Sequence, residues 1–385
     1  AASDVYKRQA FSCSDGRVSS AGLDLYFSTD GIVTAFKPVY ETYYYAYDAC
    51  DGRRETGKAL ANHGISLTAG AGVCSSLESV YSLEPVTETA EAILEGAVRY
   101  RRELERQAGF QSEAASMLAK SAAQFIARRE TTGGDTILAG YPFFEDWGRD
   151  TMIALGGCAL ATGRFETVKS ILRTFLKAEK NGLMPNLFPE GGSEPMYNTV
   201  DAALLFINSV YLYFERTNDI SFVRECYPVM EHIVRRYEEG TDFGIHMDED
   251  GLIAAGQGFD QVTWMDVRIG DILPTPRHGK PVEINAYWYN ALRIMERLGG
   301  TASAARYGRL AELVKQSFNE KFWLEEKHCL KDVISGTEDG GRAGADNQIR
   351  CNQIWAVSMA FSMLSPEKEK QVVETVAEKL YTPYG

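Results

Sequence analysis

The sequence predicts a mainly α-helical protein in which paired helices follow a shorter β-rich segment. From Glu88 onward, apolar residues recur at the spacing of amphipathic helices through most of the chain. Several of these predicted helices are apolar almost all round, which is typical of the inner ring of a double-ring helical barrel. No fixed-period repeat accompanies them. We therefore expect helical hairpins that close on themselves, not a solenoid of a common type.

Composition limits the classes of partner. The chain has 385 residues, of which 45% are hydrophobic and 24% charged, so it is long enough for two domains. Asp and Glu number 53 against 40 Lys and Arg, and the net charge of −13 repels a phosphate backbone. The Arg-rich run 99–107 alternates with Glu and is typical of a solvated helix face. Nucleic acid is not expected as a partner.

Cysteine spacing and hydropathy bear on metals, compartment and membranes. The 7 cysteines include no CxxC pair and the 5 histidines do not cluster near them. We therefore predict no disulfide framework, no metal site and a reducing, cytoplasmic location. The longest small and apolar run, 151–163, lies between Arg149 and Arg164 and is shorter than the roughly 18 residues of a membrane span. We expect a buried helix there, no membrane contact and no secretory signal.

The N-terminal part consists of two segments that differ in sequence character. Residues 1–9 contain a stretch, 4–9, that resembles the in-frame translation of a transposon end used to prepare sequencing libraries, so we exclude them from the fold prediction. In residues 10–87, short β-branched or aromatic runs are bounded by Gly, Asp and Ser, which indicates strands. The predicted strands are 23–28, 31–36 and 79–83. The tyrosine-rich stretch 40–47 fits either a sugar platform or a packing surface.

Helical spacing defines the rest of the chain. Residues 88–108 are predicted as a linker helix and residues 109–385 as a helical domain. The predicted helices of that domain are 112–128, 149–161, 165–180, 199–217, 221–238, 283–298, 302–319, 352–363 and 366–380.

Polar residues gather in the connections that open these helices. The connections are 140–150, 182–190, 194–201, 261–266 and 275–285. If the helices alternate in direction, every second connection lies at one end of the barrel, where the acids, amides and aromatic residues converge. This convergence predicts a ligand site.

The segment Phe259–Asp266 is the most informative of these connections. Asp266 follows Trp264 by two residues in a polar turn. A carboxylate beside an aromatic ring is typical of sugar sites, because the ring packs on a pyranose while the acid protonates a glycosidic oxygen. A packed indole beside a turn carboxylate explains the same residues. His278, in the next connection, is expected to be a loop histidine and not a catalytic base.

Some polar residues at predicted helix starts also have a purely structural explanation. Asn198 with Asp201 is close to a capping box, and Glu283 after Pro281 is typical of a helix start. Arg149 is different, because an Arg in the first turn opposes the helix dipole. Its position favours a carboxylate partner or a ligand.

Several of these segments carry a family resemblance. Segments 139–151, 182–186, 197–201, 263–266 and 280–286, in this order, resemble the glucosidase domain of glycogen debranching enzymes of the bacterial and archaeal type. The resemblance covers about residues 109–385. It implies an (α/α)6 barrel of the six-hairpin glycosidase type that hydrolyses α-1,6-linked glucose at branch points. A β-rich domain precedes the barrel in that family, and residues 10–87 resemble its end more loosely.

The resemblance also implies roles for single residues. Asp266 matches the family's general acid, which implies an inverting mechanism with a second carboxylate about 6.5–9.5 Å away that activates water. The residues implied to line the glucose pocket are Trp147, Arg149, Asp150, Asn186, Asn198, Asp201, Trp264 and Glu283. No metal or organic cofactor is implied, and the expected partner is glycogen or another branched α-glucan.

The resemblance places Gly385 inside the family's domain. The predicted helices are fewer than six hairpins require, so we expect an incomplete barrel and a catalytic base, a Glu, beyond Gly385. Glu283 and Asp201 are the alternative candidates for that base within the chain. Two other functions stay open: a related inverting α-glucoside hydrolase of the glucoamylase or trehalase kind, and a carbohydrate-binding protein without catalysis.

Overall fold

The computed structural model describes most of the chain and divides it into two compact units. The residues described are 12–14, 16–20, 23–50, 52, 54–141, 144–188, 194–335 and 346–384. The first unit ends at Glu103 and the second begins at Leu104, within helix α2 (Ala90–Ala108). The stretch 1–9, for which we predict an artificial origin, lies outside the described residues.

The first unit is built from antiparallel strands. Its sheet has the order β1-β2-β3-β6, and a separate hairpin joins β4 to β5 through the short helix α1. The bounds are β1 Ser12–Ser14, β2 Arg17–Ser20, β3 Leu23–Thr29, β4 Ile32–Tyr44, α1 Ala46–Cys50, β5 Thr56–Ser66 and β6 Ser79–Ser82. The three predicted strands are therefore present. None of the side chains whose burial is described in this unit is buried, and Tyr40, Tyr43 and Tyr44 are exposed. The tyrosines of β4 are therefore not core residues.

The second unit is mainly helical, as predicted. Its helices are α3 Glu113–Ala122, α4 Gly148–Leu155, α5 Phe165–Ala178, α6 Ala202–Thr217, α7 Ile220–Glu239, α8 Val282–Leu298, α9 Thr301–Lys321, α10 Trp355–Ser358 and α11 Pro366–Lys379. The short helical turns are η2 Ala123–Phe125, η3 Gly156–Leu160, η5 Asp242–Gly244 and η6 Cys351–Ile354. Two-stranded pairs complete the unit: β7 Ile126–Arg129 with β8 Gly134–Ile137, β9 His246–Met247 with β10 Ile253–Ala254, β11 Lys280–Pro281 with β14 Val333–Ile334, and β12 Trp323–Leu324 with β13 Cys329–Leu330.

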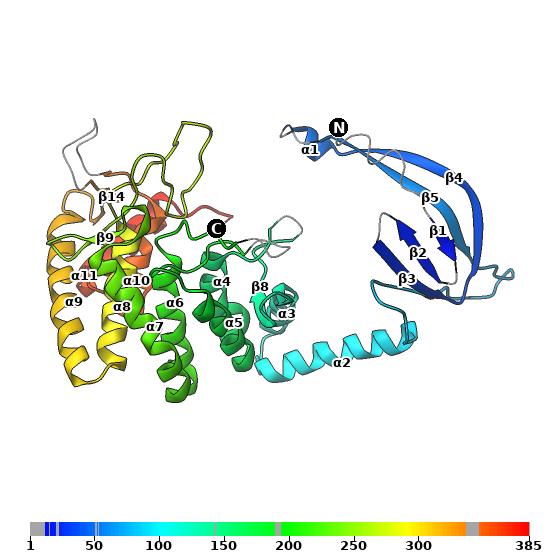
Figure 1. Ribbon diagram of the computed structural model, residues 1–385, viewed down its shortest axis with the longest axis horizontal. Helices are drawn as coiled ribbons and strands as arrows, with labels where there is room; N and C mark the ends of the chain where they lie inside the picture. Colours follow the sequence, from blue (N-terminus) through cyan, green and yellow to red (C-terminus); the bar gives the residue numbers. More distant parts are fainter. Residues whose placement is uncertain are drawn as a thin grey trace. The chain divides into compact units, whose positions relative to one another are not determined.

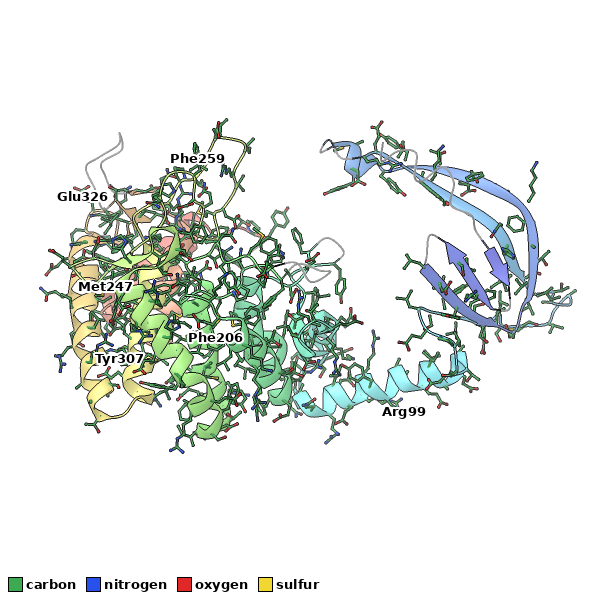
Figure 2. The ribbon with its side chains drawn as sticks, in the orientation of Figure 1. Arg99, Phe206, Met247, Phe259, Tyr307 and Glu326 are labelled. Atoms are coloured by element: carbon green, nitrogen blue, oxygen red, sulfur yellow. The ribbon has the colours of Figure 1, made fainter. Side chains whose placement is uncertain are left out.

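Successive helices form hairpins with short turns at one end and long connections at the other (Figure 1). Between α6 and α7 the chain turns at Asn218, which adopts a left-handed conformation with a φ of 54°. Asp219 then caps α7, because its side chain accepts a hydrogen bond from the Phe222 backbone amide at 3.0 Å. Figure 2 shows Phe259 on a loop at the end that carries the long connections, whereas Phe206 lies within α6.

The hairpins make two layers of helices. Helices α6 and α8 are buried on nearly all sides, whereas α5, α7 and α9 bury one apolar face. Helix α6 contacts α4 and α8 and also α5 and α7, and α8 contacts α7 and α9, so α4, α6 and α8 form one layer against which α5, α7 and α9 pack. This agrees with the prediction that helices apolar all round are inner helices. Closure of the layers into a six-hairpin ring remains a proposal.

Two predicted helices are shorter in the structure. The predicted helix 112–128 gives way to strand β7 after η2, because Ile126–Arg129 pairs with β8. The predicted helix 352–363 ends at Ser358. Its continuation is lost because the Phe361 amide donates to the Asn290 side chain of α8 at 3.2 Å. Among the helices that the structure describes, none combines the length and apolar character needed to cross a membrane.

Candidate active site

The segments that open the inner helices meet through backbone hydrogen bonds. At the start of α4, the Gly148 amide donates to the Asn186 carbonyl at 2.7 Å. Ahead of α6, the Val200 amide donates to the Val262 carbonyl at 3.0 Å. These two contacts bring the connections before α4, α6 and α8 to one end of the helical unit. The polar residues of those connections therefore lie near one another.

Arg149 stands between two carboxylates from different segments. Its Nε donates to Asp201 Oδ2 at 2.6 Å, and its Nη1 lies 3.5 Å from Asp266 Oδ2. Arg149 and Asp201 are buried, while the Asp266 side chain is 40% exposed. The Asp201 contact explains why an Arg is tolerated in the first turn of α4. The geometry also puts the accessible carboxylate at the edge of a buried ion pair.

Burial and the neighbouring charges shift the pKa values of Arg149 and Asp150. Burial of the Arg149 guanidinium lowers its pKa, but the carboxylates of Asp201 and Asp266 more than offset this, so the pKa is raised overall. The neighbouring Asp150 is exposed at the surface, yet surrounding protein atoms raise its pKa by removing water from the carboxylate. Repulsion from Asp201 and Asp266 adds to that rise, and Arg149 opposes it. The three carboxyl groups of Asp150, Asp201 and Asp266 outnumber the single Arg149 guanidinium, so the formal charge of this cluster is negative.

Several buried polar atoms in these segments have no hydrogen-bond partner. Within the described part of the chain they include Arg149 Nη2, Asn186 Oδ1, Thr199 Oγ1 and Asp201 Oδ1. Asn186 Nδ2 is engaged instead, since it lies 3.5 Å from Asn198 Oδ1. An unsatisfied buried polar group costs about 1–3 kcal/mol, and folded proteins retain few of them. These four atoms are therefore available to hydrogen-bond a polar ligand.

The capping explanation for Asn198 and Asp201 is wrong. Helix α6 begins at Ala202 with Asp201 at the N-cap position, but the Asp201 side chain makes no capping hydrogen bond. Its Oδ2 accepts from Arg149 instead. The Asp201 carboxylate therefore pairs with the Arg149 guanidinium instead of closing the start of its own helix.

The two tryptophans predicted to stack on a sugar occupy partly exposed positions. Trp147 precedes α4 and forms a backbone bridge with Leu187. Trp264 is 47% exposed, and its Nε1 donates to Asn352 Oδ1 at 2.7 Å. An indole that is half exposed beside a carboxylate can cover the apolar face of a pyranose.

Glu283 belongs to a separate buried ion cluster. Arg277 donates to both of its oxygens, with a distance of 2.7 Å between Nη2 and Oε2. The same guanidinium donates through Nε to Asp332 Oδ2 at 2.9 Å. Burial raises the pKa of Glu283, while the Arg277 hydrogen bonds lower it. A sugar hydroxyl would therefore compete with Arg277 for the Glu283 oxygens, and the predicted sugar contact of Glu283 stays a prediction.

Sequence reasoning missed Arg277, Asp332 and Asn352. Arg277 and Asp332 are 55 residues apart, and Trp264 and Asn352 are 88 apart. Local spacing carries no signal for such pairs, although Arg277 lies within a connection that the sequence singled out. His278 lies in a loop as expected, and its Nε2 lies 2.8 Å from the Asp260 carbonyl oxygen.

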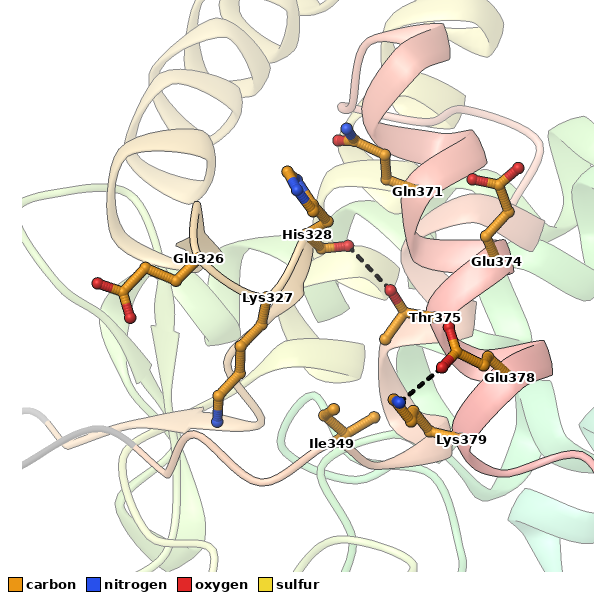
Figure 3. Close-up of a pocket in the computed structure, with 9 residues that line it drawn as sticks. All are labelled: Glu326, Lys327, His328, Ile349, Gln371, Glu374, Thr375, Glu378 and Lys379. Carbon is orange, nitrogen blue, oxygen red and sulfur yellow. Dashed lines mark hydrogen bonds and ion pairs between the residues drawn. The ribbon is translucent and has the colours of Figure 1, made fainter.

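A hollow elsewhere on the unit contains none of these residues. Figure 3 shows it between the β12–β13 turn and α11. The volume of this hollow is about 490 Å³. Its lining residues are Glu326, Lys327, His328, Ile349, Gln371, Glu374, Thr375, Glu378 and Lys379. Side chains of both charges line it, and Glu378 pairs with Lys379 at 2.6 Å. Among the described residues, no group of three or more His, Cys, Asp or Glu is placed to hold a metal ion.

The sequence pattern of a known family matches the part of the chain that contains the Arg149 group. That family is amylo-alpha-1,6-glucosidase, and the match covers residues 120–385. The chain belongs to the amylo-alpha-1,6-glucosidase family. The family resemblance predicted from the sequence segments is thereby confirmed.

A curated relative agrees with the amylo-alpha-1,6-glucosidase assignment. The glycogen debranching enzyme of Saccharomyces cerevisiae is 24% identical over 364 residues, which cover 70% of this chain. The match covers 23% of that enzyme's length.

Solved structures show a likeness in fold beyond the amylo-alpha-1,6-glucosidase family. The rhamnosidase from Klebsiella oxytoca with rhamnose bound superposes with a TM-score of 0.54 at 12% identity, covering 98% of this chain and 74% of that one. The GH78 family rhamnosidase of Bacillus sp. GL1 gives a TM-score of 0.52 at 16% identity, covering 97% and 38%. At such identities the likeness concerns the fold alone.

Proposed function

We propose that the chain carries the acid side of a glycoside hydrolase site that cleaves α-1,6-glucosidic branch points of glycogen or limit dextrin. The observation that carries this proposal is the group around Arg149, whose guanidinium contacts Asp201 and Asp266 at 2.6 and 3.5 Å. Membership of the amylo-alpha-1,6-glucosidase family supports it. The name of the yeast relative supports glycogen as the substrate class.

The buried polar atoms without partners favour a sugar over an anion. Arg149 Nη2 is a donor, Asn186 Oδ1 and Asp201 Oδ1 are acceptors, and a threonine hydroxyl is both. A carboxylate ligand would satisfy Arg149 but has no proton for the two acceptors. A sugar hydroxyl donates one hydrogen bond and accepts others. The hydroxyls of a glucose unit therefore supply both kinds of partner that these atoms need.

In the proposed reaction, Asp266 protonates the glycosidic oxygen as the bond to the anomeric carbon breaks. A second carboxylate takes a proton from water, and the resulting hydroxide attacks from the opposite face with inversion. Asp266 suits the acid role because its side chain is accessible while Arg149 and Asp201 beside it are buried. Trp147 and Trp264 would stack on the sugar.

The base is proposed to lie outside the two internal candidates. Asp201 Oδ2 is bound by Arg149, and both oxygens of Glu283 are bound by Arg277. Glu283 therefore presents no oxygen that is free to take a proton from water. Asp201 keeps an oxygen without a partner, Oδ1, and we assign that oxygen to a sugar hydroxyl.

We also propose a reducing, cytoplasmic location, which is supported by the free thiols of the described cysteines Cys226 and Cys329.

Product analysis with the full-length protein tests the function. Release of glucose from a branched limit dextrin, with no hydrolysis of maltose or trehalose, supports the proposal. Faster hydrolysis of maltose or trehalose would indicate the related α-glucoside hydrolase, and binding without hydrolysis would indicate a carbohydrate-binding protein. Proton NMR of the first glucose formed tests inversion, because an α-linkage must then yield the β-anomer.

A second experiment locates the base. Residues 1–385 are purified and assayed for glucose release from the same dextrin. No release is expected. Turnover that disappears in Asp201→Asn or Glu283→Gln would show that the base lies within the chain.

A further inference from the structure

We infer that Asn352 is a positioning residue that holds the turn from Thr263 to Asp266 in place through the indole of Trp264. The inference rests on the proposed role of Asp266 as general acid. Few contacts hold the Asp266 side chain itself. The 3.5 Å contact with Arg149 is longer than an ordinary charge-assisted hydrogen bond, and the side chain is 40% exposed. The placement of this carboxylate therefore depends on its neighbours in the chain.

The contact between Trp264 and Asn352 anchors this turn. An indole nitrogen only donates, and Trp264 Nε1 lies 2.7 Å from Asn352 Oδ1. Asn352 is 1% exposed, so its amide sits in a fixed environment, whereas the indole is 47% exposed. Met265 adds a weaker contact, with 3.7 Å between its Sδ and Asn352 Nδ2. One buried amide therefore touches both residues that immediately precede Asp266.

The orientation of the Asn352 amide is fixed by what lies on its other side. Asn352 Nδ2 donates to Asp332 Oδ1 at 2.7 Å, and a carboxylate can only accept. The amide oxygen must then face Trp264. Asp332 is held in turn by Arg277, through contacts of 2.9 Å from Nε and 3.1 Å from Nη2. The same Arg277 binds Glu283 in the first turn of α8.

This chain of contacts links the turn to α10 and α8. Asn352 lies in η6, which leads into α10, and Arg277 is anchored at the start of α8. A displacement of Asn352 is therefore passed to Trp264 and along two peptide units to Asp266. Catalytic groups are sensitive to such shifts, since a misplacement of about 1 Å can cost about 10²-fold in rate.

The matched variants are Asn352→Leu and Asn290→Leu. Leucine has nearly the shape of asparagine but makes neither hydrogen bond. Asn290 is an equally buried asparagine in α8, with hydrogen bonds to Asn208 at 3.0 Å and to the Phe361 amide at 3.2 Å. Neither of these hydrogen bonds reaches the turn at Trp264. Each variant loses the two main hydrogen bonds of one buried asparagine side chain, and Asn352→Leu also loses the weaker contact with Met265.

The first measurement needs no activity. Tryptophan indole groups are labelled with ¹⁵N in residues 1–385, and the Trp264 signal is assigned with Trp264→Phe. We expect the Trp264 N–H to exchange slowly with solvent despite the exposure of the ring, and to shift upfield and exchange at least about tenfold faster in Asn352→Leu. Asn290→Leu should leave it unchanged. Fast exchange in the unaltered chain would overturn the inference even if Asn352→Leu does not fold.

The second measurement compares two substrates with different leaving groups, in order to distinguish a misplaced acid from general damage to the protein. Full-length protein is assayed on branched dextrin and on α-glucosyl fluoride, whose fluoride needs little protonation as it leaves. A misplaced acid should reduce kcat for dextrin by about 10²-fold in Asn352→Leu but spare the fluoride substrate. Asn290→Leu should affect both substrates equally.

The outcomes distinguish this inference from the proposed function. If Asp266→Asn spares the fluoride substrate but Asn352→Leu lowers both activities together, Asp266 is the acid and Asn352 is not its positioning residue. If Asp266→Asn itself shows no selectivity for the fluoride, the acid assignment fails. The indole measurement then still decides whether Asn352 holds Trp264.

Discussion

Arg149 and Asp201, which are 52 residues apart, form a buried ion pair with 2.6 Å between Nε and Oδ2. Asp201 stands at the N-cap position of α6 and Arg149 in the first turn of α4, so the pair joins the starts of two inner helices. An Arg at a helix start is unfavourable by itself. Its retention here is explained by the acids around it and by its unpaired Nη2, which is available to a ligand.

Breaking this pair should destabilise the helical unit strongly. Arg149→Met leaves the Asp201 carboxylate buried without its partner, which typically costs about 3–5 kcal/mol. The matched control is Arg173→Met, because Arg173 pairs with Glu225 at 2.8 Å in a half-exposed position, where such pairs contribute about 0–1 kcal/mol. Urea unfolding followed by circular dichroism measures both. Equal losses would mean that burial of the Arg149 pair has no energetic consequence.

Replacing the proposed general acid should abolish hydrolysis without unfolding the protein. Asp266→Asn in full-length protein is expected to lose several orders of magnitude, of which about 10²–10⁴-fold is typical of a general acid alone. Asp271→Asn, an exposed acid in the same connection, should keep near-parental turnover. Near-parental hydrolysis by Asp266→Asn would refute the assignment.

The two partly exposed tryptophans Trp147 and Trp264 should contribute to sugar binding. Trp147→Ala or Trp264→Ala is expected to weaken binding of a glucose-containing oligosaccharide by about 1–3 kcal/mol, the scale of one buried aromatic side chain. Trp323→Ala is the control, because the Trp323 indole donates to Glu325 at 2.6 Å and lies in β12. Isothermal calorimetry compares the three. Unchanged affinity with an intact fold would assign Trp147 and Trp264 to packing alone.

Gly148 should tolerate no side chain. A Cβ there would lie 2.0 Å from the Pro185 carbonyl oxygen, so Gly148→Ala must displace the backbone that carries Asn186. We expect a loss of about 1–3 kcal/mol and weaker sugar binding. Gly156→Ala is the control, because a Cβ at Gly156 meets nothing within 4 Å. Alanine has a higher helix propensity than glycine, so this variant should stabilise the protein by about 0.5–1 kcal/mol. Thermal unfolding that ranks the two variants in the opposite order would contradict the prediction.

Asp150 and Asp219 should make the free energy of unfolding change with pH in opposite directions. Burial raises the folded-state pKa of Asp150 above its ordinary 3.8, so the folded state binds more protons and stability falls as pH rises above that value. Asp150→Asn should therefore be more stable than the parent at neutral pH, with the gain vanishing below about pH 3.8. For Asp219, the hydrogen bond from the Phe222 amide lowers the pKa.

Asp219→Asn should accordingly lose stability at neutral pH, and the loss should fade as pH falls through the lowered folded-state pKa of Asp219. Urea titrations at several pH values compare the two variants with the parent. The same sign for both variants would contradict the pKa directions.

The sequence by itself determined the helices and most of the residues of the Arg149 group. Periodicity is a local property, so the stripes of α5 to α9 and the all-round apolar character of α6 and α8 could be read directly. Arg149 was singled out by its place at a helix start and Asp266 by the neighbouring Trp264, whereas Asp201 was assigned to the site by the family resemblance. The alternation of helix direction predicted that their segments converge, but the Arg149–Asp201 pair itself is seen only in the structure.

Tertiary structure alone decided the contacts that hold these segments. Arg277 meets Asp332 across 55 residues and Trp264 meets Asn352 across 88 residues, distances over which sequence spacing carries no information. Tertiary contacts also replaced predicted helix at two places. Residues Ile126–Arg129 pair with β8 as a strand, and the Phe361 amide donates a hydrogen bond to the Asn290 side chain. In each case a hydrogen bond to a distant segment replaced a local one. Such an exchange is decided by packing, which the local sequence does not encode.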